Sequence, residues 1–387
     1  MKVVMLAPVH RYDDVRVFRK EAVTLAQAGH RVILYARTPD DEPRLESGVE
    51  VRPVRYRGRL QRFAKLPGLG RAALRERAEI YHVHNPDTLP VAFWLRLQGH
   101  RVIYDSHEDF RTELLLRRWL PGLIRRPAAA AISRAEAWAG RVLAAVIVTQ
   151  EQIRRRIPQA TLIGNPPLVS AAAIADALAG RAERSTGETI TLGYVGGISE
   201  DRGLSRMLEL TAAMNELHPT RLKLIGYPVN DDALQGAMAR PEWSLVDYLG
   251  ELAQPDAFAQ LATVDAGLIL FTDVASHRHI DPNKIYEYMA HGVPFVASDF
   301  PEWRARLQAA DAGIFVSERQ TPTIAAVAVL EMLADPEKAR ELGRNGAAFV
   351  QQHYSWQSTA APVLLNLYRR LSSRPAVSSR KSVRQRS

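Results

Sequence analysis

The chain has 387 residues, of which 47% are hydrophobic and 24% charged, so it can fill two ordinary globular cores. It contains no cysteine, which excludes a disulfide framework, a thiolate nucleophile and a zinc–thiolate site, and no apolar run is long enough to cross a bilayer. The net charge of +9 is uneven, because residues 1–190 hold 31 Lys and Arg against 20 Asp and Glu, whereas residues 191–371 hold 15 against 22.

The chain begins with an apolar stretch that is too short for a signal peptide and is predicted to be a strand. We therefore expect a cytoplasmic protein. The basic surplus of the first half could attract an anionic lipid surface or a phosphorylated substrate. It does not favour nucleic acid, because no motif combines aromatic and basic residues for base readout.

Short apolar runs alternate with longer amphipathic runs through the first half, which predicts βαβ units around a mostly parallel sheet. A helix is expected over 15–29, with Gly29 as its stop signal. Strands are expected over 2–7, 31–36, 79–84, 101–107 and 144–149. Residues 1–167 are therefore predicted to form one Rossmann-like domain.

The same alternation predicts a second Rossmann-like domain over 189–355. Its strands are expected over 189–195, 221–226, 244–250, 266–271, 294–299 and 312–317. Residues 168–188 form an expected connector, 356–371 a last helix, and 372–387 a polar, basic tail predicted to be disordered. Ligands of doubly wound sheets bind outside the carboxyl ends of the strands, so we expect the site in a cleft between the two domains.

A glycine pair follows the first strand of the second domain. Gly196 and Gly197 lie between Val195 and a helix expected to begin near Gly203. Glycine N–H groups can approach a phosphate closely, and a helix N-terminus favours an anion. Arg202 could bind a diphosphate with two hydrogen bonds. The alternative is a tight strand–helix turn with a solvated arginine.

The segment 281–294 (DPNKIYEYMAHGVP) is predicted to begin a helix near the same edge of the sheet. Asn283, Lys284 and Glu287 fall within about one turn at its N-terminus. Lys284 would neutralise phosphate there, and Glu287 would accept hydrogen bonds from ribose hydroxyls. The alternative is a surface ion pair worth about 0.2–0.5 kcal/mol.

This segment resembles the nucleotide-binding signature of the retaining family-4 glycosyltransferases, which have the GT-B fold. YVGGISEDRGL resembles their phosphate loop, and VDYLGEL resembles the strand that lines their base pocket. HRYDDVRVFRKEAVTLAQAGHRV, YHVHNPDTLP and YDSHEDF resemble first-domain motifs of a bacterial polysaccharide-assembly subgroup. HYSWQSTAAPVLLNLY resembles the closing helix, which in GT-B enzymes packs back towards the first domain.

The resemblance implies roles for individual residues. Glu287 matches the second acid of the family's Glu-x7-Glu motif, which binds the ribose, and His279 occupies the position of the first acid, beside the transferred sugar. Arg202 stands where the family commonly has lysine, and with Lys284 it would stabilise the departing diphosphate. His107 matches a histidine that faces the donor sugar; its alternatives are a general base and a structural histidine bonded to a carboxylate.

A metal site is the other chemistry that the histidines suggest. His82 and His84 alternate on one face of a predicted strand, and Asp105 and His107 alternate on the next. The resemblance argues against a metal, since GT-B transferases need none, and no Asp-x-Asp pair occurs in the sequence. We therefore expect no metal and no cofactor, only a nucleotide diphosphate sugar as donor substrate.

The segment 117–134 (RRWLPGLIRRPAAAAISR) interleaves arginine pairs with bulky apolar residues. Such a pattern suits peripheral contact with an anionic membrane surface, although a helix with one buried and one basic face is the alternative. The basic surplus of the first half favours membrane contact, at the inner face of the cell membrane.

The resulting hypothesis is a hexosyltransferase that moves sugar from a nucleotide diphosphate donor to a glycan or lipid-linked acceptor, with retention, in cell-surface polysaccharide or glycoconjugate synthesis. A non-hydrolysing sugar-nucleotide epimerase shares the two-domain architecture but would need an acid–base pair of carboxylates, which is not obvious here. A degenerate, non-catalytic binding subunit is suggested by His279.

Overall fold

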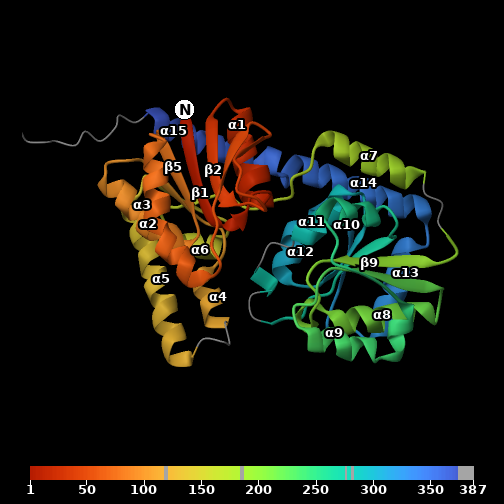
Figure 1. The fold of residues 1–387 in the computed structure, drawn as a ribbon. Helices are drawn as coiled ribbons and strands as arrows, with labels where there is room; N and C mark the ends of the chain where they lie inside the picture. The colour runs from red at the N-terminus through yellow and green to blue at the C-terminus, as the bar shows by residue number, and fades with distance from the viewer. Residues whose placement is uncertain (117–120, 184–186, 275–276, 280–282, 374–387) are drawn as a thin grey trace, which may run out of the picture. The chain divides into compact units, whose positions relative to one another are not determined.

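The computed structural model describes residues 1–116, 121–183, 187–274, 277–279 and 283–373 (Figure 1). The chain divides into two compact units, one comprising Met1–Asn165 and Ala360–Ser387, and the other comprising Pro166–Thr359. Each unit is built on one sheet, and together they give the predicted α/β architecture of two Rossmann-like domains. Among the described residues, no helix has the length and apolar character that a membrane span requires.

The first unit contains an eight-stranded sheet with the order β3-β4-β2-β1-β5-β6-β7-β8. Its strands are β1 (Lys2–Arg11), β2 (Arg31–Arg37), β3 (Arg44–Glu46), β4 (Val49–Pro53), β5 (Ile80–His84), β6 (Val102–Ser106), β7 (Ala145–Val148) and β8 (Thr161–Leu162). All neighbours are parallel except β3 and β4. The five predicted strands are present, and their nearly continuous apolar runs reflect burial on both faces of the sheet.

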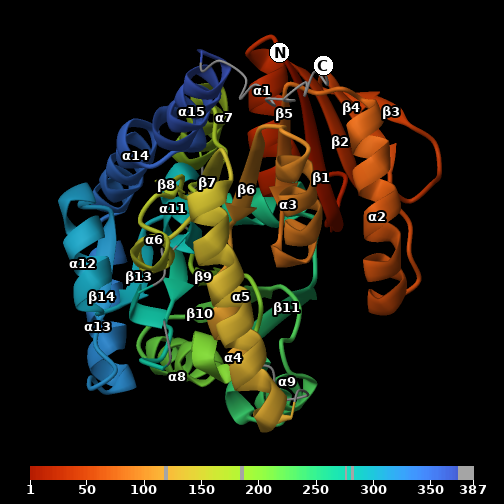
Figure 2. The same ribbon diagram turned by 90° about the vertical axis from the view of Figure 1, so that its left-hand side faces the viewer.

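Helices cover both faces of this sheet (Figures 1 and 2). They are η1 (Val15–Ala22), α1 (Val23–Gln27), α2 (Arg59–Arg75), η2 (Pro86–Thr88), α3 (Leu89–Leu97), α4 (Phe110–Leu116), α5 (Gly122–Val142), α6 (Glu151–Arg156) and α15 (Ala361–Ser373). The core beneath α2, α3 and α5 takes alternate residues of the strands, such as Tyr81 and Val83 of β5. The intervening residues of β5, His82 and His84, therefore point to the opposite face.

The expected helix over 15–29 has an unexpected form. Residues Val15–Ala22 form a π-helix and Val23–Gln27 an α-helix, and the element ends before Gly29, whose φ is +82°. The Asp14 side chain caps the start by accepting hydrogen bonds from two backbone N–H groups of the first turn. A π-helix is rare and often occurs at functional sites.

The β3–β4 hairpin is absent from the predicted elements. Ser47 and Gly48 connect its strands with φ values of 49° and 79°. Two consecutive positive φ angles are typical of the tight turn that matches the twist of paired strands. The hairpin extends one edge of the first sheet.

The second unit contains a six-stranded, wholly parallel sheet with the order β11-β10-β9-β12-β13-β14. Its strands are β9 (Ile190–Val195), β10 (Thr220–Ile225), β11 (Val246–Gly250), β12 (Ala266–Ile269), β13 (Phe295–Ser298) and β14 (Gly313–Val316). All six correspond to predicted strands. The order reverses between β10-β9 and β12, which places a topological switch point at the carboxyl end of β9.

Helices α8 and α13 pack together on one face of this sheet, while α11 contacts β12 and β13 (Figure 1). The helices of the unit are α7 (Ala171–Ala182), η3 (Glu200–Arg202), α8 (Leu204–Asn215), α9 (Asp231–Met238), η4 (Pro241–Leu245), α10 (Gln254–Leu261), η5 (His277–His279), α11 (Asn283–Ala290), α12 (Pro301–Leu307), η6 (Gln308–Ala310), α13 (Pro322–Leu333), α14 (Pro336–His353) and η7 (Trp356–Ala360).

The segments outside the two sheets also have defined places. Residues 168–188, expected to be a connector, contain α7, which packs against α14 within the second unit. The expected last helix is divided into η7 and α15, and α15 packs against η1 of the first unit. Most of the expected disordered tail, 374–387, lies outside the described residues.

Candidate functional site

The carboxyl ends of β9, β10 and β11 are joined through glycine backbone. The Gly196 N–H donates to the Ile225 carbonyl oxygen at 2.9 Å, and the Gly226 N–H donates to the Gly250 carbonyl oxygen at 2.8 Å. Gly226 has φ +142°, and a Cβ there would lie 1.7 Å from the Gly196 carbonyl oxygen. Only glycine fits at residue 226, which the sequence interpretation did not single out.

Arg202 lies against the second glycine of the predicted pair. Its Nη1 donates to the Gly197 carbonyl oxygen at 3.4 Å, and a Cβ on Gly197 would lie 2.7 Å from the same nitrogen. The Tyr194 hydroxyl donates to the same carbonyl oxygen at 2.7 Å and so helps to fix the backbone of the loop. The structure therefore brings Gly197 and Arg202 together in the predicted phosphate loop, whose binding role stays a prediction.

Gly203 begins α8 with the left-handed φ of +84°. A Cβ on this residue would lie 2.1 Å from the Leu270 carbonyl oxygen, so the close approach of α8 to the end of β12 depends on glycine. The N-terminus of α8 consequently lies beside the phosphate loop, where its N–H groups favour an anion.

Lys284 and Glu287 lie on the first turns of α11. Lys284 Nζ donates to Glu287 Oε2 at 2.9 Å, with side-chain exposures of 35% and 15%. A Cβ on Gly196 would lie 3.4 Å from Lys284 Cε, so the lysine stem lies against the phosphate loop. The two motifs, separated by more than 80 residues in the sequence, therefore form one site.

A buried tyrosine fixes α11 to the sheet. The Tyr288 hydroxyl accepts from the Val195 N–H at 3.1 Å and donates to the Leu268 carbonyl oxygen at 3.4 Å. Its ring occupies the space that a Cβ on Gly267 would need, at 2.3 Å. These contacts set the rotation of α11 and with it the direction of Lys284.

Two further predicted residues are less closely tied to this loop. Asn283 Oδ1 accepts from the Tyr354 hydroxyl at 3.5 Å, which is the limit of hydrogen-bond distance. His279 ends η5. Asp281 and Pro282, which open the predicted segment, lie outside the described residues.

Arg206 is a polar residue of this edge that the sequence interpretation missed. Its Nη1 donates to the Leu270 and Phe271 carbonyl oxygens and to Ser298 Oγ, at 3.0, 3.2 and 3.1 Å. Burial lowers the pKa of this guanidinium, although Glu318 opposes the shift. The sequence feature that could have identified Arg206 is its position among the buried apolar residues in the first turns of α8.

His107 belongs to the first unit and follows β6 directly. Its Nδ1 lies 3.5 Å from Asp105 Oδ1, and its ring centroid lies 5.0 Å from that of His10. His10 in turn contacts Asp14 at 3.2 Å and Asn85 at 2.7 Å. The carboxylate contact expected for a structural histidine is therefore present.

Asp105 is paired with a buried arginine. Arg16 Nη2 donates to Asp105 Oδ2 at 2.8 Å, and Arg16 Nη1 donates to the Gly164 carbonyl oxygen at 3.2 Å. Burial alone would raise the pKa of Asp105, but Arg16 and His107 outweigh burial and hold this pKa well below its usual range. Asp105 is therefore a charged anchor for His107.

Glu21 and the two histidines of β5 complete this buried group. Burial and the Asp105 carboxylate raise the pKa of Glu21 well above its usual range, despite Arg16. Burial lowers the pKa of His82 to about 4 and also lowers the pKa of His84. Neither Arg16 nor Glu21 was singled out from the sequence. Charged residues are spread through η1, at Arg16, Arg19, Lys20 and Glu21, so the sequence does not mark which of them are buried.

The two groups of residues have different chemical capacities. At the carboxyl edge of the second sheet, Arg202, Lys284 and the N-terminus of α8 form a cationic surface with one carboxylate, Glu287, beside it. Such a surface suits a diphosphate together with a neighbouring hydroxyl group. In the first unit, His107 has a position fixed by a charged carboxylate.

Two domain families match the sequence. The glycosyl transferase 4-like domain matches residues 15–168, and the group 1 domain of glycosyl transferases matches residues 189–335. Together these matches span most of the chain. No curated protein matches the sequence.

Several solved structures have the same fold over nearly the whole chain. Sucrose-phosphate synthase from Thermosynechococcus elongatus is 19% identical with a TM-score of 0.68, and the match covers 96% of this chain and 99% of that one. WaaG, a glycosyltransferase involved in lipopolysaccharide biosynthesis, is 16% identical with a TM-score of 0.63 and coverages of 94% and 99%. HepE from Anabaena, in complex with UDP-glucose, is 16% identical with a TM-score of 0.61 and coverages of 97% and 100%.

Proposed function

We propose that this chain, which is a glycosyltransferase of the GT-B fold, transfers a hexose-type sugar from a nucleotide diphosphate to a glycan or lipid-linked acceptor. The observation that carries the proposal is the contact of Lys284 with Gly196, which joins the phosphate loop to the α11 carboxylate in one site. Similar structures were solved with UDP and with UDP-glucose, which supports a donor of this class.

In the proposed reaction, the acceptor oxygen attacks the anomeric carbon while the bond from that carbon to the diphosphate breaks. Arg202, Lys284 and the N-terminus of α8, which follows Gly196 and Gly197, stabilise the charge that develops on the diphosphate, in place of a metal ion. A freed phosphate oxygen takes the acceptor proton, so a strong protein base is unnecessary. We propose retention of configuration, with the nucleotide's ribose on Glu287, Asn283 beside it and His279 near the transferred sugar. His107 of the first unit is proposed as a further catalytic residue.

A thermal-shift measurement tests donor binding. A nucleoside diphosphate at 100 times its Kd is expected to stabilise the protein by about 2.7 kcal/mol through mass action. Glu287→Ala should remove most of the shift, because the ribose loses its acceptor. Absence of a shift with every nucleoside diphosphate would contradict the proposal, and an unchanged shift in Glu287→Ala would contradict the role of this carboxylate.

Transfer itself is distinguished from epimerisation by the product. The bound donor, incubated with a glycan or polyprenyl-diphosphate-linked acceptor, is expected to give a glycosylated acceptor and a nucleoside diphosphate. Formation of an epimer of the donor without acceptor would defeat the transferase assignment and support the epimerase alternative.

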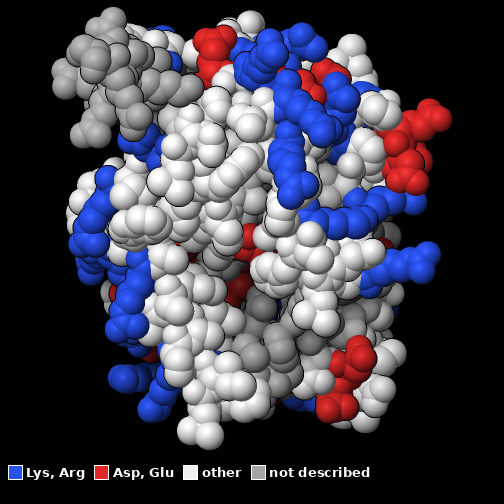
Figure 3. All heavy atoms as spheres, turned by 60° about the vertical axis from the view of Figure 1, so that its left-hand side comes forward, with Lys and Arg blue, Asp and Glu red and all other residues white. Residues whose placement is uncertain are grey.

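We further propose that the first unit binds the inner face of the cell membrane through the start of α5. Leu123 and Ile124, at the start of α5, are 92% and 55% exposed. Arg125 and Arg126 follow them in the sequence, and Figure 3 shows Lys and Arg side chains exposed at the protein surface. The predicted Trp119 and Leu120 lie outside the described residues. Exposed apolar residues beside arginines suit an interface with anionic lipid.

Replacing Leu123 and Ile124 together by serine is expected to weaken binding to anionic vesicles by roughly 10–100-fold, because two partly inserted side chains return to water. Vesicle co-sedimentation measures the effect. The matched control is Leu97→Ser, an 85% exposed leucine at the end of α3. Equal losses in the two variants, or equal binding to neutral vesicles, would contradict membrane contact at α5.

A further inference from the structure

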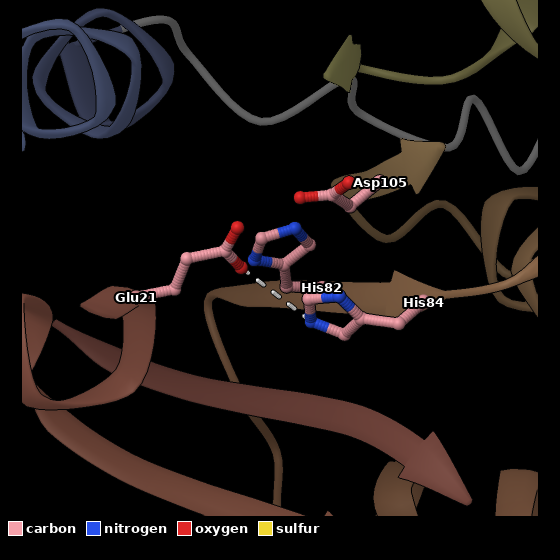
Figure 4. A group of neighbouring side chains, drawn as sticks. All are labelled: Glu21, His82, His84 and Asp105. Atoms are coloured by element: carbon pink, nitrogen blue, oxygen red, sulfur yellow. Dashed lines mark ion pairs between the residues drawn. The ribbon is translucent and has the colours of Figure 1, made fainter. Parts of the chain in front are cut away.

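Four ligand-type side chains meet on one face of the first sheet (Figure 4). Glu21 comes from η1, His82 and His84 from β5, and Asp105 from β6, where it is the register partner of His84. Each side chain is completely buried. One nitrogen or oxygen atom from each residue lies within 4.8 Å of the corresponding atoms of the other three.

Most of the polar atoms in this cluster have no hydrogen-bond partner. They are both carboxylate oxygens of Glu21, Nε2 of His82, both ring nitrogens of His84 and Oδ1 of Asp105. The two oxygens of Glu21 have ion-pair contacts only. Glu21 Oε1 lies 3.1 Å from Arg16 Nη2, and Glu21 Oε2 lies 3.8 Å from His84 Nε2. A buried polar atom without a partner costs about 1–3 kcal/mol, so this arrangement needs a common partner.

The other ring nitrogen of His82 and the other carboxylate oxygen of Asp105 already have hydrogen-bond partners outside the cluster. His82 Nδ1 lies 2.9 Å from the Tyr368 hydroxyl of α15, and Asp105 Oδ2 accepts from Arg16 at 2.8 Å. These contacts leave His82 Nε2 facing the cluster, together with Asp105 Oδ1, whose other neighbour is His107 Nδ1 at 3.5 Å. Metal-binding histidines and carboxylates are commonly oriented in this way by hydrogen bonds to their other atoms.

We propose that Glu21, His82, His84 and Asp105 bind one divalent transition-metal ion, for which Zn²⁺ is the best match. Two imidazole nitrogens and two carboxylate oxygens form a donor set that Zn²⁺ accepts in tetrahedral geometry. Donor atoms around tetrahedral Zn²⁺ lie about 3.3 Å apart, given bonds of about 2.0–2.1 Å, so the cluster contracts slightly when it binds the ion.

The alternative partner is a proton on Glu21, which would balance the charges of Asp105 and Arg16. A single proton joins only two atoms, whereas a four-coordinate ion takes a lone pair from each of the four side chains. The geometry therefore favours the metal. The ion would have four protein ligands and no open position, which is typical of structural sites.

From the sequence, a metal at His82, His84, Asp105 and His107 is an alternative that the resemblance argues against. The structure instead groups Glu21 of η1 with His82, His84 and Asp105, and the proposed ion is structural. The proposed ion ties η1, β5 and β6 together and, through Tyr368, holds α15 on the first sheet. It also fixes Asp105, the neighbour of His107.

Metal analysis tests the proposal independently of sugar transfer. The full chain, purified without a histidine tag or chelator and exchanged against micromolar Zn²⁺, is expected to hold about one equivalent of tightly bound metal. Co²⁺ in its place should give the visible absorption of a tetrahedral site. Removing the ion with a strong chelator should lower Tm, and adding Zn²⁺ should restore it.

His84→Gln and Glu21→Gln should each lose the bound metal. The matched control His218→Gln, an exposed histidine of the second unit, should keep it. If the buried variants do not fold, the titration of chelator-treated wild-type protein with Zn²⁺ decides. Less than about 0.1 equivalents of metal together with a Tm that no divalent ion changes would overturn the proposal and leave the proton as the partner.

Discussion

Replacing Lys284 by alanine is expected to lower kcat/KM for sugar transfer by about 10²–10³-fold, the loss typical of a removed charge-stabilising donor. Its side-chain stem lies on α11 against Gly196, close to where the departing diphosphate would carry its charge. The fold should change little, because the Lys284–Glu287 pair is partly exposed and spaced i,i+3, so its contribution to stability is about 0.5 kcal/mol or less.

The chain offers a matched control. Lys338 and Glu341 on α14 form an ion pair of the same spacing at 3.0 Å, with both side chains 49% exposed. Lys338→Ala should leave both Tm and kcat/KM unchanged. Lys284→Arg should keep part of the activity, since it retains the charge with a different shape. Steady-state kinetics with the donor varied measures all three variants, and equal activity in Lys284→Ala and Lys338→Ala would remove Lys284 from the mechanism.

Gly203→Ala is expected to destabilise the second unit by about 3–5 kcal/mol, because it adds a Cβ both at a left-handed φ and against a backbone carbonyl. The added Cβ would lie 2.1 Å from the Leu270 carbonyl oxygen, and neither atom belongs to a flexible side chain. If the variant folds, α8 must move away from β12, and donor affinity should fall with it.

Denaturant unfolding followed by circular dichroism, with and without a nucleoside diphosphate, measures this effect. Gly236→Ala is the control, since Gly236 lies inside α9 with nothing within 4 Å of an added Cβ. It should stabilise the protein by about 0.5–1 kcal/mol. A Gly203→Ala variant as stable as Gly236→Ala would show that the approach of α8 to β12 does not depend on glycine.

Alternation of apolar runs was enough to predict the two sheets, because a parallel strand buried on both faces has a nearly continuous apolar sequence. It did not reveal β3 and β4, two short and partly exposed strands, of which β3 forms the edge of the sheet. The motif residues of the second unit were predictable, since Gly196, Gly197 and Lys284 adjoin clear strand and helix signals. Gly226 was not, because its role depends on a carbonyl from another strand.

The Arg16–Glu21 pair illustrates a stronger limit. Residues five apart point about 140° away from each other in an α-helix, which advances about 100° per residue. The i→i+5 hydrogen bonding of a π-helix brings such residues towards one face, and the two side chains lie 3.1 Å apart in η1. A sequence interpretation that assumes the α-helical period therefore places Arg16 and Glu21 on different faces of the helix, whereas in the structure they form an ion pair.

The membership of α15 in the first unit has a consequence for biosynthesis. The last strand of the first sheet ends at Leu162, and α15 begins roughly 200 residues later in the chain. The ribosome therefore synthesises the whole first sheet long before it synthesises α15, whose Tyr368 contacts His82. While the second unit is translated, the face of the first sheet around His82 therefore lacks the helix that covers it in the folded protein. The order of synthesis makes the second unit, which is continuous in sequence, the first that can finish folding.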